Sequence, residues 1–264
     1  MKKYDLFNSD SICIFTDSSF KKYKHLPSNT AVGVTAPAFC IYRGDYLIEQ
    51  GFHILHDSTS QQGELYAMLL GVMASYKYRN FPHIRLFSDN QNAVFSVREW
   101  IFKWAMETAN GRRTLGPDGR INNQDYIMDI IYTIISNNIY LELYHVKGHV
   151  DIKNRDSIQT SRSLFERSNP WVGRIDDALV FQLAMGNNAV DEYSTVMLRD
   201  HIYDDRYSTK DLTKAVEIGY TPFDMHNYIT LVNKDGKHRD FNKVTTVPYE
   251  GDKNDSEKRA PKDN

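Results

Sequence analysis

Residues 11–20 read SICIFTDSSF, an apolar run that ends at an aspartate. The run 12–15 consists of residues that a buried β-strand uses, and Asp17 follows it almost at once. Burying the charge of a carboxylate is costly unless another group pairs with it. The stretch therefore predicts a central strand that delivers Asp17 to a site shared with other polar groups.

The composition is that of an ordinary soluble protein. The chain has 264 residues, of which 41% are apolar and 25% charged, which favours one large domain or one domain with an appendage. Its net charge of −2 creates only a weak overall field, so any contact with phosphates must come from local patches. Cys13 and Cys40 stand in apolar runs, which predicts buried thiols in a reducing cytoplasm. The chain has neither a signal peptide pattern nor an apolar run of the roughly 18 residues that a membrane helix needs, so we expect a cytoplasmic protein without membrane contact.

The apolar pattern predicts an α/β domain. Strands are expected over 11–16, 31–42, 46–55, 84–88 and 139–146, the first three as an antiparallel meander. Helices are expected over 61–78, 91–106, 124–136 and 174–185. This order favours a mixed five-stranded sheet flanked by helices rather than a regular alternation of parallel strands and helices.

Carboxylates stand at the ends of these predicted elements. Asp17 closes the first strand, Asp89 closes the fourth, and Glu64 opens the first long helix. Asp176 and Asp177 open the last helix. Carboxylates that are brought together repel one another, which raises their pKa values unless a divalent cation neutralises them. Hard oxygen ligands suit Mg²⁺ or Mn²⁺, and two such ions stabilise both the attacking water and the leaving oxygen of a phosphodiester.

Five short motifs follow one another along the chain in this order: IFTDSS, TSQQGEL, FSDNQ, HVKGH and DDALV. They closely resemble the successive motifs of the ribonuclease H family, and of its type 1, ribonuclease HI-like members in particular. The resemblance runs from about residue 10 to 186, with an insertion at 150–173. It implies the ribonuclease H-like fold and an endonuclease that uses two Mg²⁺ ions, with Mn²⁺ as a substitute. It also implies hydrolysis of the RNA strand of an RNA–DNA hybrid, leaving a 3′-hydroxyl and a 5′-phosphate.

The same resemblance implies the roles of individual residues. Asp17, Glu64 and Asp89 match metal-binding carboxylates, and His149 matches a histidine that assists proton transfer or product release. For the fourth metal-binding acid, Asp176 and Asp177 both remain open, and the apolar residues that follow favour Asp177. The residues implied to bind substrate are Ser18, Gln61, Gln91, Lys103, Trp104, Asn123 and Lys147. The run 99–104, followed by Arg112 and Arg113, resembles a basic region that grips the phosphates of the DNA strand.

Three parts of the chain depart from the family pattern. The family often has a glycine-rich loop near the ribose 2′-hydroxyls, where this chain has SSFKKYKHLPSN, so selectivity for the RNA strand is open. A resolvase-type nuclease on another structured nucleic acid and a catalytically silent nucleic-acid-binding module therefore remain alternatives. The insertion at 150–173 is either an added strand clamp or a surface elaboration. Residues 187–248 are expected to form a C-terminal extension through which a protein partner can bind, and 249–264 a disordered tail.

Overall fold

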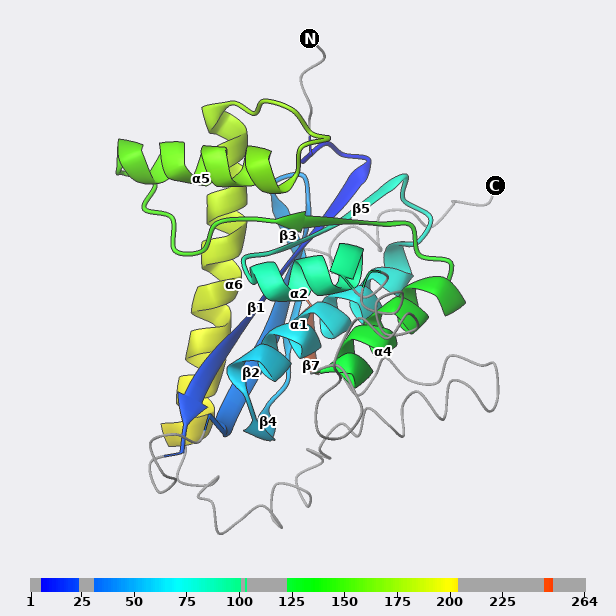
Figure 1. The fold of residues 1–264 in the computed structure, drawn as a ribbon, viewed down its shortest axis with the longest axis vertical. Coiled ribbons are helices and arrows are strands. Elements are labelled where there is room, and N and C mark those ends of the chain that lie inside the picture. Colours follow the sequence, from blue (N-terminus) through cyan, green and yellow to red (C-terminus); the bar gives the residue numbers. More distant parts are fainter. Residues whose placement is uncertain (1–5, 24–30, 101–102, 104–122, 204–244, 249–264) are drawn as a thin grey trace, which may run out of the picture.

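The computed structural model describes residues 6–23, 31–100, 103, 123–203 and 245–248, which form a sheet with helices on both faces (Figure 1). The strands are β1 (Ser11–Lys22), β2 (Gly33–Arg43), β3 (Tyr46–Phe52), β4 (Leu55–Ser58), β5 (His83–Ser88), β6 (Leu141–His145) and β7 (Thr245–Pro248). The helices are α1 (Ser60–Ser75), α2 (Gln91–Phe95), α4 (Gln124–Ser136), α5 (Arg155–Ser168) and α6 (Asp177–Tyr203), with the short turns η1 (Tyr76–Tyr78) and η2 (Ser96–Trp100). Among the described residues, no helix has the length and apolar character needed to cross a bilayer.

The strands follow the order β6-β5-β1-β2-β3-β7, and β4 pairs with β2 away from this path. Strands β1, β2 and β3 are antiparallel neighbours, whereas β5 runs parallel to both β1 and β6. A mixed sheet of this order with flanking helices is the ribonuclease H-like fold, so the predicted fold class is confirmed. The sheet has seven strands rather than five, because β4 and β7 add to the expected set.

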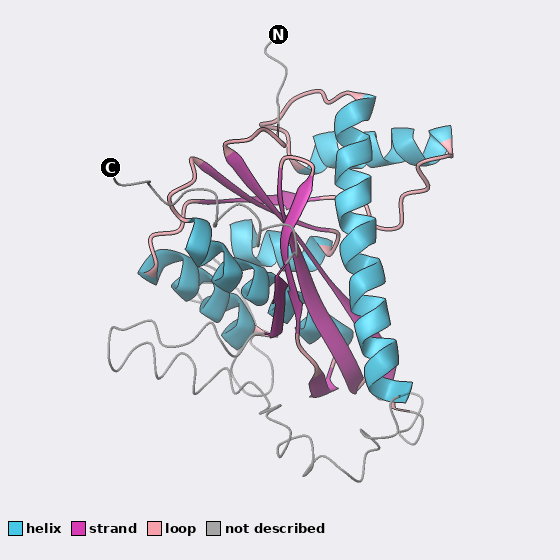
Figure 2. Ribbon diagram, turned by 180° about the vertical axis from the view of Figure 1, so that it is seen from behind, coloured by secondary structure: helices cyan, strands magenta, loops and turns pink. Residues whose placement is uncertain are grey.

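The side chains of β1 alternate between two cores. Ile12 and Ile14 pack with residues of α1 and α4, whereas Cys13 and Phe15 pack with residues of α6. Helices α1, α2 and α4 lie in front of the sheet in Figure 1, and α6 lies in front of it in the reverse view of Figure 2. Because strand side chains point alternately to opposite faces, Asp17 belongs to the series that faces α6.

Helix α1 begins at a reciprocal cap. The Gln62 backbone N–H donates to Thr59 Oγ1 over 3.2 Å, and the Thr59 backbone N–H donates to Gln62 Oε1 over 2.8 Å. This capping box satisfies two amides that the first turn of a helix leaves without partners. It thereby fixes the start of the helix, and with it the position of Glu64, two residues later.

Strand β1 is longer than the sequence predicts. The apolar run indicates an end at Asp17, but the strand continues to Lys22 because β2 pairs with it from Ile12↔Arg43 to Lys22↔Gly33. The parallel pairing with β5 stops earlier, at Thr16↔Ser88. Asp17 therefore lies within β1, at the point where the neighbouring strand ends.

Helix α6 is also longer than predicted. It runs without a break from Asp177 to Tyr203, across residue 186, where the sequence suggests a domain boundary. Val190 is fully buried and Leu198 is nearly so, which places the later turns of the helix in the domain core. The domain built around the sheet therefore includes the later turns of this helix. Of the predicted C-terminal extension, β7 pairs with β3, while residues 204–244 and the predicted tail at 249–264 lie outside the described residues.

The contact between α6 and β1 leaves no room for a side chain at Gly186. A Cβ atom there would overlap the ring of Phe15, with Cδ2 of that ring at 2.7 Å. Alanine has the higher helix propensity by about 1 kcal/mol, but overpacking a core costs about 1–3 kcal/mol. We expect Gly186→Ala to lower the free energy of unfolding, measured by urea denaturation. Met185→Ala, a change at the exposed neighbouring position, is the control, and a Gly186→Ala protein as stable as this control would contradict the close packing.

Candidate active site

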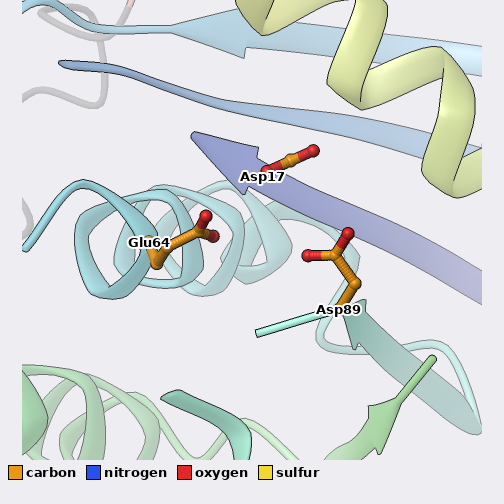
Figure 3. Close-up of side chains that lie close together, drawn as sticks. All are labelled: Asp17, Glu64 and Asp89. Atoms are coloured by element: carbon orange, nitrogen blue, oxygen red, sulfur yellow. The ribbon is translucent and has the colours of Figure 1, made fainter. Parts of the chain in front are cut away.

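Three carboxylates from separate elements meet at one edge of the sheet (Figure 3). Asp17 and Asp89 are the residues that directly follow the last parallel pair of β1 and β5, Thr16↔Ser88. Glu64 reaches the same point from α1. Each residue offers one oxygen, and these three atoms lie within 4.8 Å of one another. The sequence prediction that these three acids converge is therefore confirmed.

The environment of Asp17 and Glu64 disfavours the charged forms of their carboxyl groups. Asp17 is 7% exposed and Glu64 is 8% exposed. Burial, and then the charge of Asp89, raise the pKa of Asp17 to about 7. Burial also raises the pKa of Glu64 well above its ordinary value, and the charges of Asp17 and Asp89 add to this effect. In the absence of a cation, Asp17 and Glu64 therefore retain protons to a higher pH than isolated carboxyl groups do.

The hydrogen bonds within the site leave part of its acceptor capacity unused. Asp17 Oδ1 accepts from the Ser18 backbone N–H over 2.6 Å, and Asp89 Oδ2 accepts from Asn187 Nδ2 over 3.2 Å. Glu64 Oε2 is buried without a hydrogen-bond partner. Within the described residues, none of the three carboxylates forms a salt bridge with a lysine or arginine. Converging, unpaired oxygen ligands of this kind fit a hard divalent cation such as Mg²⁺.

A fourth acid, Asp191 of α6, lies beside the three. Its charge raises the pKa values of both Asp17 and Glu64, although it lies outside the group of oxygens within 4.8 Å. Its Oδ2 lies 3.2 Å from Nδ1 of His149, whose side chain is 80% exposed. The structure thus places His149 beside Asp191, a neighbour that the sequence analysis missed, and the predicted role of His149 stays a prediction.

Neither of the two acids predicted as the fourth ligand reaches the cluster. Asp176 caps α6, because its Oδ1 accepts from the Leu179 backbone N–H over 2.9 Å. Asp177, 65% exposed, pairs with Arg162 of α5. Fourteen residues separate Asp177 from Asp191 along one continuous helix, a rise of roughly 21 Å. The acid of α6 that lies beside the cluster is therefore Asp191, in the middle of the helix, and not Asp176 or Asp177 at its start.

A signal for Asp191 does exist in the sequence. Asn187, Asp191 and Ser194 are spaced by four and three residues, which places them on one face of a helix. In the structure this polar stripe faces the site, where Asn187 donates to Asp89 and Ser194 Oγ lies 3.0 Å from Ser19 Oγ. The stripe is detectable only if the helix is known to continue beyond residue 185.

The residues predicted to bind substrate lie on several different elements. Ser18 points away from Asp17, since its buried Oγ packs against Gly63 of α1 and has no hydrogen-bond partner. Gln61 lies in the first turn of α1, Gln91 is exposed at the start of α2, Asn123 immediately precedes α4, Lys103 is exposed, and Lys147 donates to the Gly148 carbonyl. Trp104, Arg112 and Arg113 lie outside the described residues. The substrate-binding roles of this set stay predictions.

Gly148 of the HVKGH motif lies directly against Asp89. A Cβ atom at this position would overlap the Asp89 carboxylate, with its Cγ at 3.0 Å. We therefore expect Gly148→Ala to displace Asp89 and to weaken Mn²⁺ binding about tenfold, measured by isothermal titration calorimetry. Gly173→Ala is the contrast, because Gly173 has a φ of 76° and open space around it. That variant should lose stability and keep the metal affinity, and equal affinities in both variants would contradict the predicted contact.

Comparisons with known proteins complete the description of the site. No family model and no curated protein matches the sequence. Similar solved structures include RNase H1 of the halophilic archaeon Halobacterium salinarum, with 15% identity over 60% of this chain and 96% of that one and a TM-score of 0.36. LC9-RNase H1, a type 1 RNase H with the type 2 active-site motif, has 12% identity over 67% of this chain and 87% of that one, with a TM-score of 0.42. The RNase H domain of prototype foamy virus has 16% identity over 61% of this chain and 93% of that one, with a TM-score of 0.41. The order and direction of the strands, rather than these distant superpositions, support the fold: the described part of the chain has the ribonuclease H-like fold, with a candidate triad of Asp17, Glu64 and Asp89.

Proposed function

We propose that the protein is a divalent-metal-dependent nuclease that hydrolyses the RNA strand of RNA–DNA hybrids. The observation that carries the proposal is the convergence of Asp17, Glu64 and Asp89, with oxygens within 4.8 Å and no cationic partner among the described residues. When bound there, Mg²⁺ supplies Lewis acidity toward the phosphate and lowers the pKa of a coordinated water. The cluster itself supports phosphodiester hydrolysis, and the ordered sequence motifs support the hybrid as the substrate.

The residues of the chain have separate tasks in this proposal. Asp17, Glu64 and Asp89 hold the metal ions, and Asp191 takes the place of the fourth acid. His149 exchanges a proton with the reacting groups, because its exposed ring lies at the rim of the cluster. Asp191 orients that ring through Nδ1, which leaves Nε2 as the atom that faces the substrate.

The test is cleavage of four end-labelled substrates in Mg²⁺: an RNA–DNA hybrid, single-stranded RNA, an RNA duplex and a DNA duplex. We expect the hybrid alone to be cut, in its RNA strand, and the activity to disappear in EDTA. The Asp17→Asn variant, which removes one metal ligand at nearly constant volume, should be inactive. Cleavage of a DNA or RNA duplex in preference to the hybrid would support the metal-dependent nuclease and show that the proposed substrate is wrong. Binding of the hybrid without cleavage of any substrate would instead identify a silent binding module.

A further inference from the structure

We propose that the inserted helix α5 positions the active-site residue Asp89 through a relay of hydrogen bonds, Ser168 to His145 to the Asp89 carbonyl. The relay would make the insertion at 150–173 part of the catalytic apparatus rather than a surface elaboration. The inference rests on the proposed function, because it concerns the placement of a residue proposed to hold the metal.

The relay passes through both nitrogens of one buried imidazole. His145 Nδ1 lies 3.0 Å from Ser168 Oγ, and His145 Nε2 lies 3.2 Å from the backbone carbonyl oxygen of Asp89. A carbonyl oxygen only accepts hydrogen bonds, so Nε2 must be the protonated nitrogen. In the Nε2–H tautomer Nδ1 is the acceptor nitrogen, and it accepts from the Ser168 hydroxyl. The Asp89 carbonyl therefore sets the tautomer of His145, and Ser168 supports that tautomer by donating to Nδ1.

Asn169, the residue after Ser168, fastens the end of α5 to β6. Its Oδ1 accepts from the His145 backbone N–H over 3.2 Å, and its Nδ2 donates to the His145 carbonyl over 2.9 Å. One fully buried side chain thus satisfies both backbone groups of His145, as a further strand would do at this side of the sheet. The pairing fixes the last residue of β6, and with it the direction of the imidazole.

Arg98 closes the same junction from η2. It donates to Asn169 Oδ1 over 3.1 Å, to the Ser168 carbonyl over 3.0 Å and to the Leu143 carbonyl over 3.3 Å. Its guanidinium also lies 4.6 Å from the ring centre of Trp171. Arg98 thereby joins η2 to Leu143 of β6, 45 residues later in the sequence, and to the end of α5, 70 and 71 residues later. A helix that only decorated the surface would have no need of a buried polar junction of this kind.

The relay holds the backbone carbonyl of Asp89, whereas Asn187 and Gly148 contact its side chain. A ligand carboxylate must be placed within about 0.5 Å for tight metal binding, so its backbone anchor matters as much as its side-chain contacts. Loss of the relay would let Asp89 move relative to Asp17 while the fold stays intact.

The experiment compares the Mn²⁺ affinity of the full chain and four variants by isothermal titration calorimetry. Ser168→Ala removes the donor to the imidazole, and His145→Met removes both ring nitrogens. His145→Gln keeps an N–H donor at the position of Nε2. Ser163→Ala is the matched control, since its exposed hydroxyl on α5 bonds only to the Gln159 carbonyl of the same helix. We expect about tenfold weaker binding for Ser168→Ala and His145→Met, and near-normal binding for His145→Gln and Ser163→Ala.

A second measurement reports on the relay without metal. The ¹⁵N chemical shifts of His145 should show an Nε2–H tautomer in the wild type, and the Nδ1 resonance should move in Ser168→Ala, where that nitrogen loses its hydrogen-bond donor. If the wild type binds no Mn²⁺, the proposed metal site itself fails, and this inference fails with it. If the wild type binds Mn²⁺, while Ser168→Ala and His145→Met bind it as tightly as Ser163→Ala does, the relay alone is overturned.

Discussion

Replacing Asp191 with asparagine is expected to lower the rate of hybrid cleavage about 100-fold, whereas Asp177→Asn should leave the rate unchanged. The first change removes the acid whose charge acts on Asp17 and Glu64, and it weakens the partner of His149. A 100-fold loss corresponds to roughly 2.7 kcal/mol of transition-state stabilisation. Initial rates on an end-labelled RNA–DNA hybrid at saturating Mg²⁺ measure both effects.

Asp177→Asn is the matched control because it makes the same chemical change on the same helix. Its side chain is 65% exposed and pairs with Arg162, so its loss costs at most about 1 kcal/mol of stability. Melting temperatures of the two variants would separate a catalytic defect from a folding defect. An active Asp191→Asn protein beside an inactive Asp177→Asn protein would overturn the position that the structure gives to the fourth acid.

The three central carboxylates were predictable because each is set by local rules. Asp17 and Asp89 follow apolar runs that form adjacent parallel strands, and the carboxyl ends of parallel strands lie at the same edge of a sheet. Glu64 follows a capping box that fixes the start of α1. For such residues, the adjacent amino-acid sequence is enough to predict where the carboxylate lies in the fold.

Asp191 and α5 escaped prediction because tertiary contacts define them. The polar stripe of α6 interrupts its apolar periodicity at the residues that face the site, so the pattern suggests an end near 185 where the helix in fact continues. Helix α5 buries few apolar side chains. It begins at the Asn154 cap and is held by Arg98 and Asn169, whose partners are remote in sequence. Local periodicity contains no record of such contacts.

Raising the pH from about 4 to 8 is expected to cost the metal-free protein about 4 kcal/mol of stability at Asp17 alone. The pKa of Asp17 rises from an ordinary 3.8 to about 7 in the folded protein, chiefly through burial and then through the charge of Asp89. Between these values the folded state holds a proton that the unfolded state has lost, so the free energy of unfolding falls as the pH rises. The size follows from about 1.36 kcal/mol per pKa unit.

The Asp17→Asn variant isolates this contribution, because its amide has no proton to lose. Other groups act in the opposite direction: burial lowers the pKa of His53 to about 4, so ordinary titration in the unfolded state adds stability as the pH rises toward neutrality. The difference between the urea unfolding profiles of wild type and variant in EDTA cancels that background. We expect the free energy of unfolding of the variant to rise relative to that of the wild type as the pH rises from about 4 to 8. Saturating Mg²⁺ should remove this difference, because the bound cation neutralises the carboxylate as the proton does. Parallel profiles in EDTA would mean that Asp17 of the metal-free protein is less buried, and less close to Asp89, than the structure indicates.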